Sequence, residues 1–159
     1  MTNSFQWAFF LARLSAGMSM FGHGLVRLPK LAGFSNWMMG KFENSILPKV
    51  LVFPFSYALP IAEFIVGVLL LLGLFSRYAL VAGSLIMTGL IFGSSMIEDW
   101  SAIPSQLIHA AYFSILLCFV NQYNFLAIDD RVKILNVFYR NKLLIHFIIT
   151  IFIKSINRF

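Results

Sequence analysis

Two ionisable side chains of opposite sign lie within long apolar stretches of the chain, Arg13 in residues 5–28 and Glu63 in residues 53–75. At 1.5 Å per helical residue, Arg13 is about 12 Å from the start of its stretch and Glu63 about 15 Å from the start of its own. If the stretches cross a bilayer in opposite directions, both depths fall near the middle of a hydrocarbon core about 30 Å thick. A lone charge there costs roughly 2.5–3.5 kcal/mol on insertion scales. We therefore predict a buried ion pair between Arg13 and Glu63.

Two interpretations of this pair stay open. Buried ionic groups sometimes do no more than set helix register. Alternatively, the pair is a polar site for a ligand or a proton, and Arg13 and Glu63 are then candidate ligand-site residues.

Two histidines, His23 and His109, are predicted at similar depth near the outer ends of their helices. Imidazoles in that position can relay protons, hydrogen-bond a quinone carbonyl or bind a metal. Together with Lys30 they form a candidate outer polar site. A metal usually needs three or four ligands, and no recognisable spacing supplies the others, so no metal is predicted. The alternative is that each histidine is hydrogen-bonded separately by neighbours in its helix. No residue is assigned a catalytic role.

The composition belongs to a membrane protein. Apolar residues make up 60% of the chain and charged residues 11%, against roughly half and a quarter in soluble domains. Four stretches are long enough to span a bilayer, at 5–28, 53–75, 78–97 and 103–127. We expect an all-α polytopic membrane protein, a four-transmembrane-helix bundle occupying residues 1–127. The single cysteine, Cys118, excludes a disulfide within the chain.

Two further segments are expected at the membrane surface. Between the first two spans, at 29–52, Phe34, Trp37, Met38 and Phe42 follow a helical spacing, which predicts an amphipathic surface helix. The basic, membrane-associated tail at 128–159 contains an apolar run at 143–153 that reaches only about 16 Å as a helix. We interpret 143–159 as an interfacial helix, with a tilted fifth span as the alternative.

The distribution of cations predicts the orientation. Four spans place both termini and the turn at Arg77 on one side of the membrane. Seven cations outside the spans lie on that side and four on the other: Arg77, Arg131, Lys133, Arg140, Lys142, Lys154 and Arg158 against Arg27, Lys30, Lys41 and Lys49. By the positive-inside rule, both termini and the Arg77 turn are cytoplasmic. The expected partner is the lipid bilayer, with no nucleic acid, because no basic face is free of the membrane.

Glycines indicate where helices approach closely. Gly17 and Gly24 share a helical stripe with Arg13, and Gly67 lies one turn after Glu63. Gly89 and Gly93 form a GxxxG pattern in the third span. Small residues at these spacings are typical of helix–helix contacts in membranes, so we predict packing at all five.

These features resemble the DoxX family across about the first hundred residues. The resemblance rests on Arg13 with Gly17, the run HGLVRLPK at 23–30, PIAE at 60–63 and LLLGLFSR at 70–77. It implies a four-helix protein of the bacterial cytoplasmic membrane, and Asp129 resembles the aspartate that follows the last span in that family. The tetrapeptide at 121–124 departs from the glycine pair common there, and the apolar basic tail is extra.

The resemblance also implies a quinone-linked role, since founding DoxX members are subunits of a thiosulfate:quinone oxidoreductase. Quinone is accordingly the cofactor to consider. Three functions stay open: a membrane subunit of a quinone-linked redox system, a non-enzymatic assembly factor or scaffold for another membrane or envelope protein, and a small-solute or lipid carrier. A cavity that reaches Glu63 would favour ligand chemistry, and a closed interior would favour a scaffold.

Overall fold

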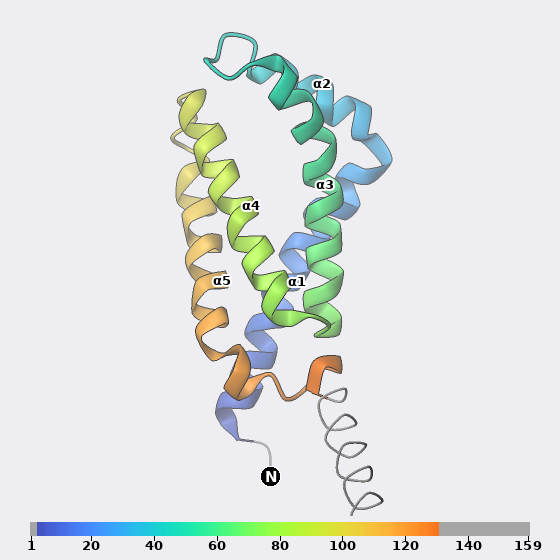
Figure 1. The fold of residues 1–159 in the computed structure, drawn as a ribbon, viewed down its shortest axis with the longest axis vertical. Coiled ribbons are helices and arrows are strands. Elements are labelled where there is room, and N and C mark those ends of the chain that lie inside the picture. The colour runs from blue at the N-terminus through green and yellow to red at the C-terminus, as the bar shows by residue number, and fades with distance from the viewer. Residues whose placement is uncertain (1–2, 131–159) are drawn as a thin grey trace, which may run out of the picture.

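The computed structural model describes residues 3–130, and this part of the chain contains helices and no strand. Four long helices, α1 (Ser4–Arg27), α3 (Lys49–Leu72), α4 (Ser76–Met96) and α5 (Ile103–Tyr123), run up and down (Figure 1). A 3₁₀ turn, Leu28–Lys30, leads from α1 into the shorter α2 (Leu31–Lys41). The predicted all-α fold with four long helices is confirmed. Most of the tail at 128–159, including both alternatives for 143–159, lies outside the described residues.

Among the described residues, three segments are long and apolar enough to cross a membrane: α3, α4 and the stretch Ile103–Asp130 that begins with α5. The first helix, 24 residues long, is not among them, so its predicted membrane crossing stays a prediction. Large apolar side chains such as Leu11, Leu85, Ile108 and Ile115 are exposed on the outside of the helices. Such a surface suits lipid, and the described residues have the architecture of a multi-pass membrane protein.

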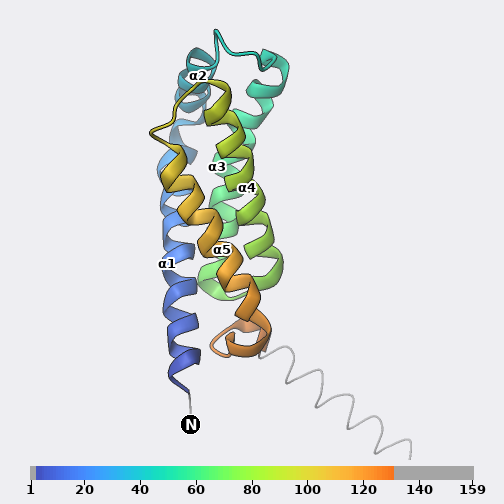
Figure 2. The same ribbon diagram turned by 90° about the vertical axis from the view of Figure 1, so that its left-hand side faces the viewer.

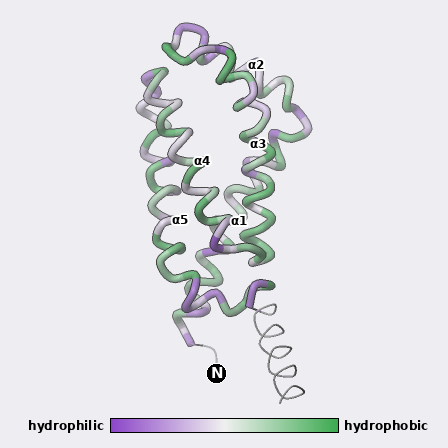
Figure 3. Tube along the Cα trace, in the orientation of Figure 1, coloured by the Kyte–Doolittle hydropathy of each residue, from purple (hydrophilic) through white to green (hydrophobic). Residues whose placement is uncertain are grey.

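The helices pack as two pairs, α1 with α3 and α4 with α5. The pairs approach one another at the end where α3 turns into α4 and lie further apart at the end covered by α2 (Figure 1). The view turned by 90° shows the long helices running along the long axis of the molecule (Figure 2). One nearly inaccessible side chain from each long helix, Met20, Leu70, Leu80 and Phe113, contributes to the main core. Apolar residues run along the helices, and hydrophilic ones gather towards the two ends (Figure 3).

Close contact at glycines sets the register between α1 and α3. A Cβ at Gly24 would come within 2.4 Å of the Phe64 backbone, and one at Gly67 within 2.3 Å of the Phe21 backbone. A Cβ at Gly17 would meet the Leu71 backbone at 3.0 Å. The residue numbers of each facing pair add to 88. Packing at Gly17, Gly24 and Gly67 is therefore as predicted, because only glycine lets the backbones come this close.

The same register separates Arg13 from Glu63. Residue 13 lies level with residue 75, and residue 63 with residue 25, so the two side chains are offset by about 12 residues, or roughly 18 Å along the axis. The predicted Arg13–Glu63 ion pair is wrong. Matching the ends of the apolar stretches had placed residue 5 opposite residue 75, whereas the first turns of α1 extend past the end of α3. There Phe5 stacks on Tyr123, with 5.6 Å between ring centres.

The helix α2 lies within the predicted surface segment and crosses the end of the bundle where α1 ends and α3 begins (Figure 1). Met38 is buried, Phe34 and Phe42 pack against a second apolar cluster with Val52 and Leu59, and Trp37 stays exposed. A hydrogen bond of 2.7 Å between the Ser56 and Ser35 hydroxyls joins α3 to α2. The position of α2 at a membrane surface stays a prediction.

Candidate functional site

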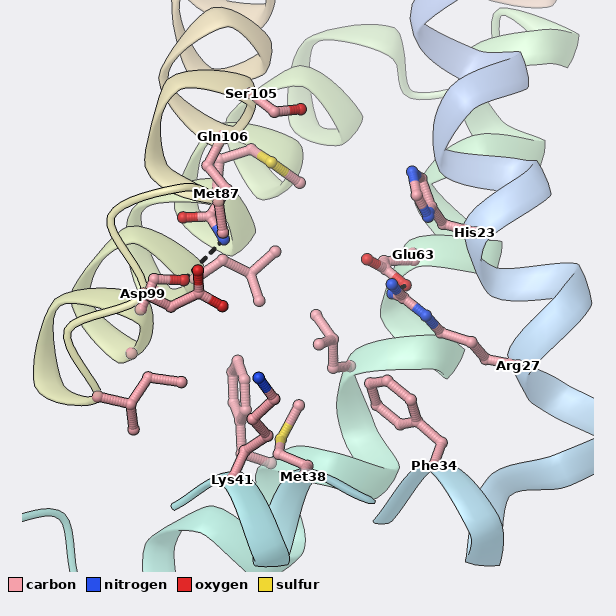
Figure 4. A pocket seen from close by; sticks show the side chains of 18 of the residues that line it. His23, Arg27, Phe34, Met38, Lys41, Glu63, Met87, Asp99, Ser105 and Gln106 are labelled. Atoms are coloured by element: carbon pink, nitrogen blue, oxygen red, sulfur yellow. Dashed lines mark hydrogen bonds and ion pairs between the residues drawn. The ribbon is translucent and has the colours of Figure 1, made fainter. Parts of the chain in front are cut away.

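A cavity of about 320 Å³ lies between the two helix pairs, beneath α2 (Figure 4). Arg27 and Glu63 line it from the α1–α3 side, and Gln106 lines it from the α5 side. Lys41 projects into it from α2, opposite Asp99 of the α4–α5 turn. Apolar and aromatic side chains supply most of the remaining wall: Met20, Phe34, Trp37, Met38, Phe42, Phe55, Leu59, Met87, Leu90 and Ile97. An apolar pocket with a few converging polar groups is the usual form of a small-molecule site.

The strongest polar feature of the cavity is an ion pair between Arg27 and Glu63. Arg27 donates to the Glu63 carboxylate at 2.5 Å, and its guanidinium lies 4.8 Å from the centre of the Phe34 ring. The Glu63 side chain is only 3% exposed, whereas that of Arg27 is 28% exposed. Gly24 brings α1 onto α3 about one turn before Arg27, which places Arg27 within reach of Glu63. The carboxylate faces the cavity (Figure 4).

Arg13 belongs to a different polar cluster, at the opposite end of the bundle. Its guanidinium donates to the Asn124 side-chain oxygen at 2.9 Å and to the Leu126 carbonyl at 2.6 Å. Asn124 in turn donates to the Ser76 hydroxyl at 2.9 Å. The planar fork of arginine suits two acceptors at once, and it ties α1 to the segment that follows α5. This arrangement is a structural clamp, and Arg13 does not reach the cavity.

Asp129 completes this cluster. Its two carboxylate oxygens accept the backbone N–H groups of Phe75 and Ser76, each at 2.7 Å, and its own N–H donates to the Gly73 carbonyl at 3.0 Å. Gly73 ends α3 in the left-handed conformation, with φ of 66°. Asp129 therefore caps the start of α4 and holds the turn between α3 and α4. Arg77 follows this turn and is exposed in the first turn of α4.

The two histidines of the predicted outer site both line the cavity, but Lys30 does not. His109 is held on both nitrogens. Nδ1 lies 2.8 Å from the Ser105 carbonyl, which can only accept, so Nδ1 carries the proton and Nε2 accepts from the Ser19 hydroxyl at 3.0 Å. The bond to Ser105 lies within α5, as the alternative for this histidine supposed, whereas the bond to Ser19 crosses to α1. His23 is exposed on α1. Within residues 3–130, no group of three histidine, cysteine, aspartate or glutamate side chains could hold a metal ion.

Gly89 and Gly93 were expected to contact a helix, and the structure differs. A Cβ at Gly89 would meet only the Phe55 ring, at 3.9 Å, and one at Gly93 only the Phe42 ring, at 3.3 Å. Both glycines line the cavity. Their lack of side chains leaves space between α4 and the aromatic rings, instead of bringing two backbones together.

Arg27 is the site residue that sequence reasoning missed as a partner for Glu63. It was counted among the outer cations because it stands at the end of an apolar stretch. The signal that could have found it is the glycine spacing. Aligning Gly24 and Gly67 as the points of closest approach places Arg27, and not Arg13, beside Glu63.

Fold and site together define a class, a multi-pass helical membrane protein with a polar-lined cavity between two helix pairs. The model of the DoxX family matches residues 8–95, more than half of the chain. The chain therefore belongs to the DoxX family, and the matched segment includes both Arg27 and Glu63. No curated protein and no solved structure matches the chain.

Proposed function

We propose that the protein binds the headgroup of a quinone in the cavity and acts as a membrane subunit of a quinone-linked redox system. One observation carries the proposal: the cavity reaches the buried Arg27–Glu63 pair. Its volume of about 320 Å³ is at the lower end of the range of roughly 300–1,000 Å³ found for small-molecule sites. A scaffold has no need of such a cavity, since a sealed pair would set helix register equally well.

The cavity walls suit the chemistry of a quinone. Its ring packs against aromatic and methionine side chains, and its carbonyl oxygens accept hydrogen bonds from cationic donors such as Arg27 and Lys41. Reduction converts both carbonyls to hydroxyls and takes up two protons and two electrons. The Glu63 carboxylate accepts a hydrogen bond from a hydroxyl, and the His23 imidazole offers a further hydrogen-bonding group. The electrons come from a partner redox subunit.

The proposal includes an orientation in the membrane. Four spans in the bacterial cytoplasmic membrane, with both termini in the cytoplasm, place the cavity and α2 towards the outer side. Two observations support α1 as the fourth span: it has the same length as α3, 24 residues, and it packs along α3 with glycine-mediated contacts.

Mass spectrometry of molecules retained by the gently purified protein tests this function. Gly89→Leu adds a side chain that projects from α4 into the cavity, and Thr88→Leu places the same side chain on the exposed side of α4. We expect wild type and Thr88→Leu to retain a quinone and Gly89→Leu to lose it. Equal quinone in all three proteins, or none in the wild type, would contradict the proposal. A stable wild type without any retained small molecule would favour the scaffold.

A further inference from the structure

A shallow groove runs along the outer face of α1, next to the cavity. It is lined by six residues of this helix: Met18, Ser19, Gly22, His23, Val26 and Arg27. His23 and Arg27 line the cavity as well. The groove and the cavity therefore adjoin at these two side chains.

The groove residues form two parallel rows along the helix. Met18, Gly22 and Val26, spaced four residues apart, make an apolar row, and both of its side chains are exposed. Ser19, His23 and Arg27 make a polar row beside it, since residues four apart lie on one face of a helix. His23 and Arg27 of the polar row line the cavity, and Met18 and Val26 of the apolar row are exposed.

Residues of α1 and α5 border the cavity from two sides. Ser19 and His109 join these helices by a hydrogen bond of 3.0 Å. Beyond this bond, towards α2, His23 and Ser105 border the cavity from the two helices and both are exposed. They lie on opposite sides of the space in Figure 4. A molecule that enters here crosses from the apolar row to the polar row.

We propose that the α1 groove holds the isoprenoid tail of the quinone whose headgroup occupies the cavity, and that the quinone enters from the lipid between α1 and α5. This inference rests on the proposed function and narrows its ligand to a tailed, membrane-dissolved quinone. The argument for this occupant is that the groove adjoins the cavity at His23 and Arg27 and that the polar row lies beside the apolar one. A ligand with a polar head and an apolar tail fits both at once, and Gly22 leaves open space for the tail.

Filling the groove tests the proposal. A Cβ at Gly22 meets no atom within 4 Å, and the same holds for Gly33 on α2. Gly22→Phe therefore places a ring in the groove from a Cβ position that is free of contacts, and Gly33→Phe is its matched control. Binding is read from quenching of Trp37, which lines the cavity, after Trp7 and Trp100 are replaced by Phe.

Two quinones are compared, a benzoquinone with an isoprenoid tail and the same ring without one. Gly22→Phe should raise the Kd of the tailed quinone about tenfold, which corresponds to 1.4 kcal/mol, and leave that of the tail-less ring unchanged. Gly33→Phe should change neither. An unchanged Kd of the tailed quinone in Gly22→Phe would overturn the groove while the cavity function stands.

A photoreactive group on the first isoprene unit of the tail gives an independent readout. Cross-linking should concentrate on residues 18–26. Equal labelling of other exposed apolar positions, such as Ile108 and Ile115 of α5, would overturn the proposal, as would equal competition by a phospholipid. If neither quinone quenches Trp37, the proposed function is wrong. The groove proposal, which rests on that function, then falls as well.

Discussion

A double-mutant cycle on Arg27 and Glu63 tests the register on which the site depends. Arg27→Leu leaves the Glu63 carboxylate, 3% exposed, without its cation. Removing one member of a buried pair costs roughly 3–5 kcal/mol, so we expect about 3 kcal/mol here. Glu63→Leu leaves Arg27, which is 28% exposed and still lies on the Phe34 ring. Because this guanidinium can turn towards water, we expect a smaller loss of about 1–2 kcal/mol.

The double variant should recover much of the loss, with a coupling energy of about 2 kcal/mol, since neighbours that share an interaction couple by roughly 0.5–3 kcal/mol. Thermal unfolding in one detergent, followed by circular dichroism, measures it. For a chain of this size, 1 kcal/mol shifts the Tm by about 2–4 °C, so Arg27→Leu should lower it by about 6–12 °C.

A second cycle, on Arg13 and Glu63, is the control. Their offset of about 18 Å along the helix axis exceeds the distance beyond which substitutions usually add within about 0.5 kcal/mol. Additive losses are therefore expected. Coupling between Arg13 and Glu63, or additivity between Arg27 and Glu63, would refute the α1–α3 register and with it the position of the site.

Three further predictions concern the glycine contacts, the cap of α4 and the orientation in the membrane. Gly24→Ala should destabilise the protein by about 1–3 kcal/mol, because its Cβ would overlap the α3 backbone. Gly22→Ala, whose Cβ would meet no atom within 4 Å, should be neutral or stabilising by up to about 1 kcal/mol. Thermal unfolding distinguishes the two variants. Asp129→Ala removes the cap of α4 and should cost about 1–2 kcal/mol, which hydrogen exchange at the first turn of α4 would localise. In a cysteine-free background, a cysteine at the exposed position Asn44 should react with an impermeant maleimide in intact cells and one at the exposed position Arg77 should not; the reverse pattern would invert the orientation.

The clamp around Arg13 shows a limit of sequence reasoning. Asn124 was recognised only as a departure from the family pattern, and Asp129 only as the counterpart of a family aspartate. In the structure Asn124 accepts from Arg13, and Asp129 caps α4. These partners lie more than fifty residues apart in sequence, and no periodicity relates them. Only the docking of the segment after α5 against the α3–α4 turn brings them together.

The amino-acid sequence by itself determined the helices, because an apolar stretch in lipid must satisfy its backbone hydrogen bonds internally. It also determined the family and the three glycines at the α1–α3 contact. The tertiary structure decided which polar side chains contact one another. Hydropathy varies slowly along a helix and marks its ends to within a few residues, whereas an ion pair needs the two helices aligned to within about one turn. Close backbone approach at Gly24 and Gly67 sets that alignment, so Glu63 pairs with Arg27 beside an open cavity and Arg13 clamps the far end of the bundle.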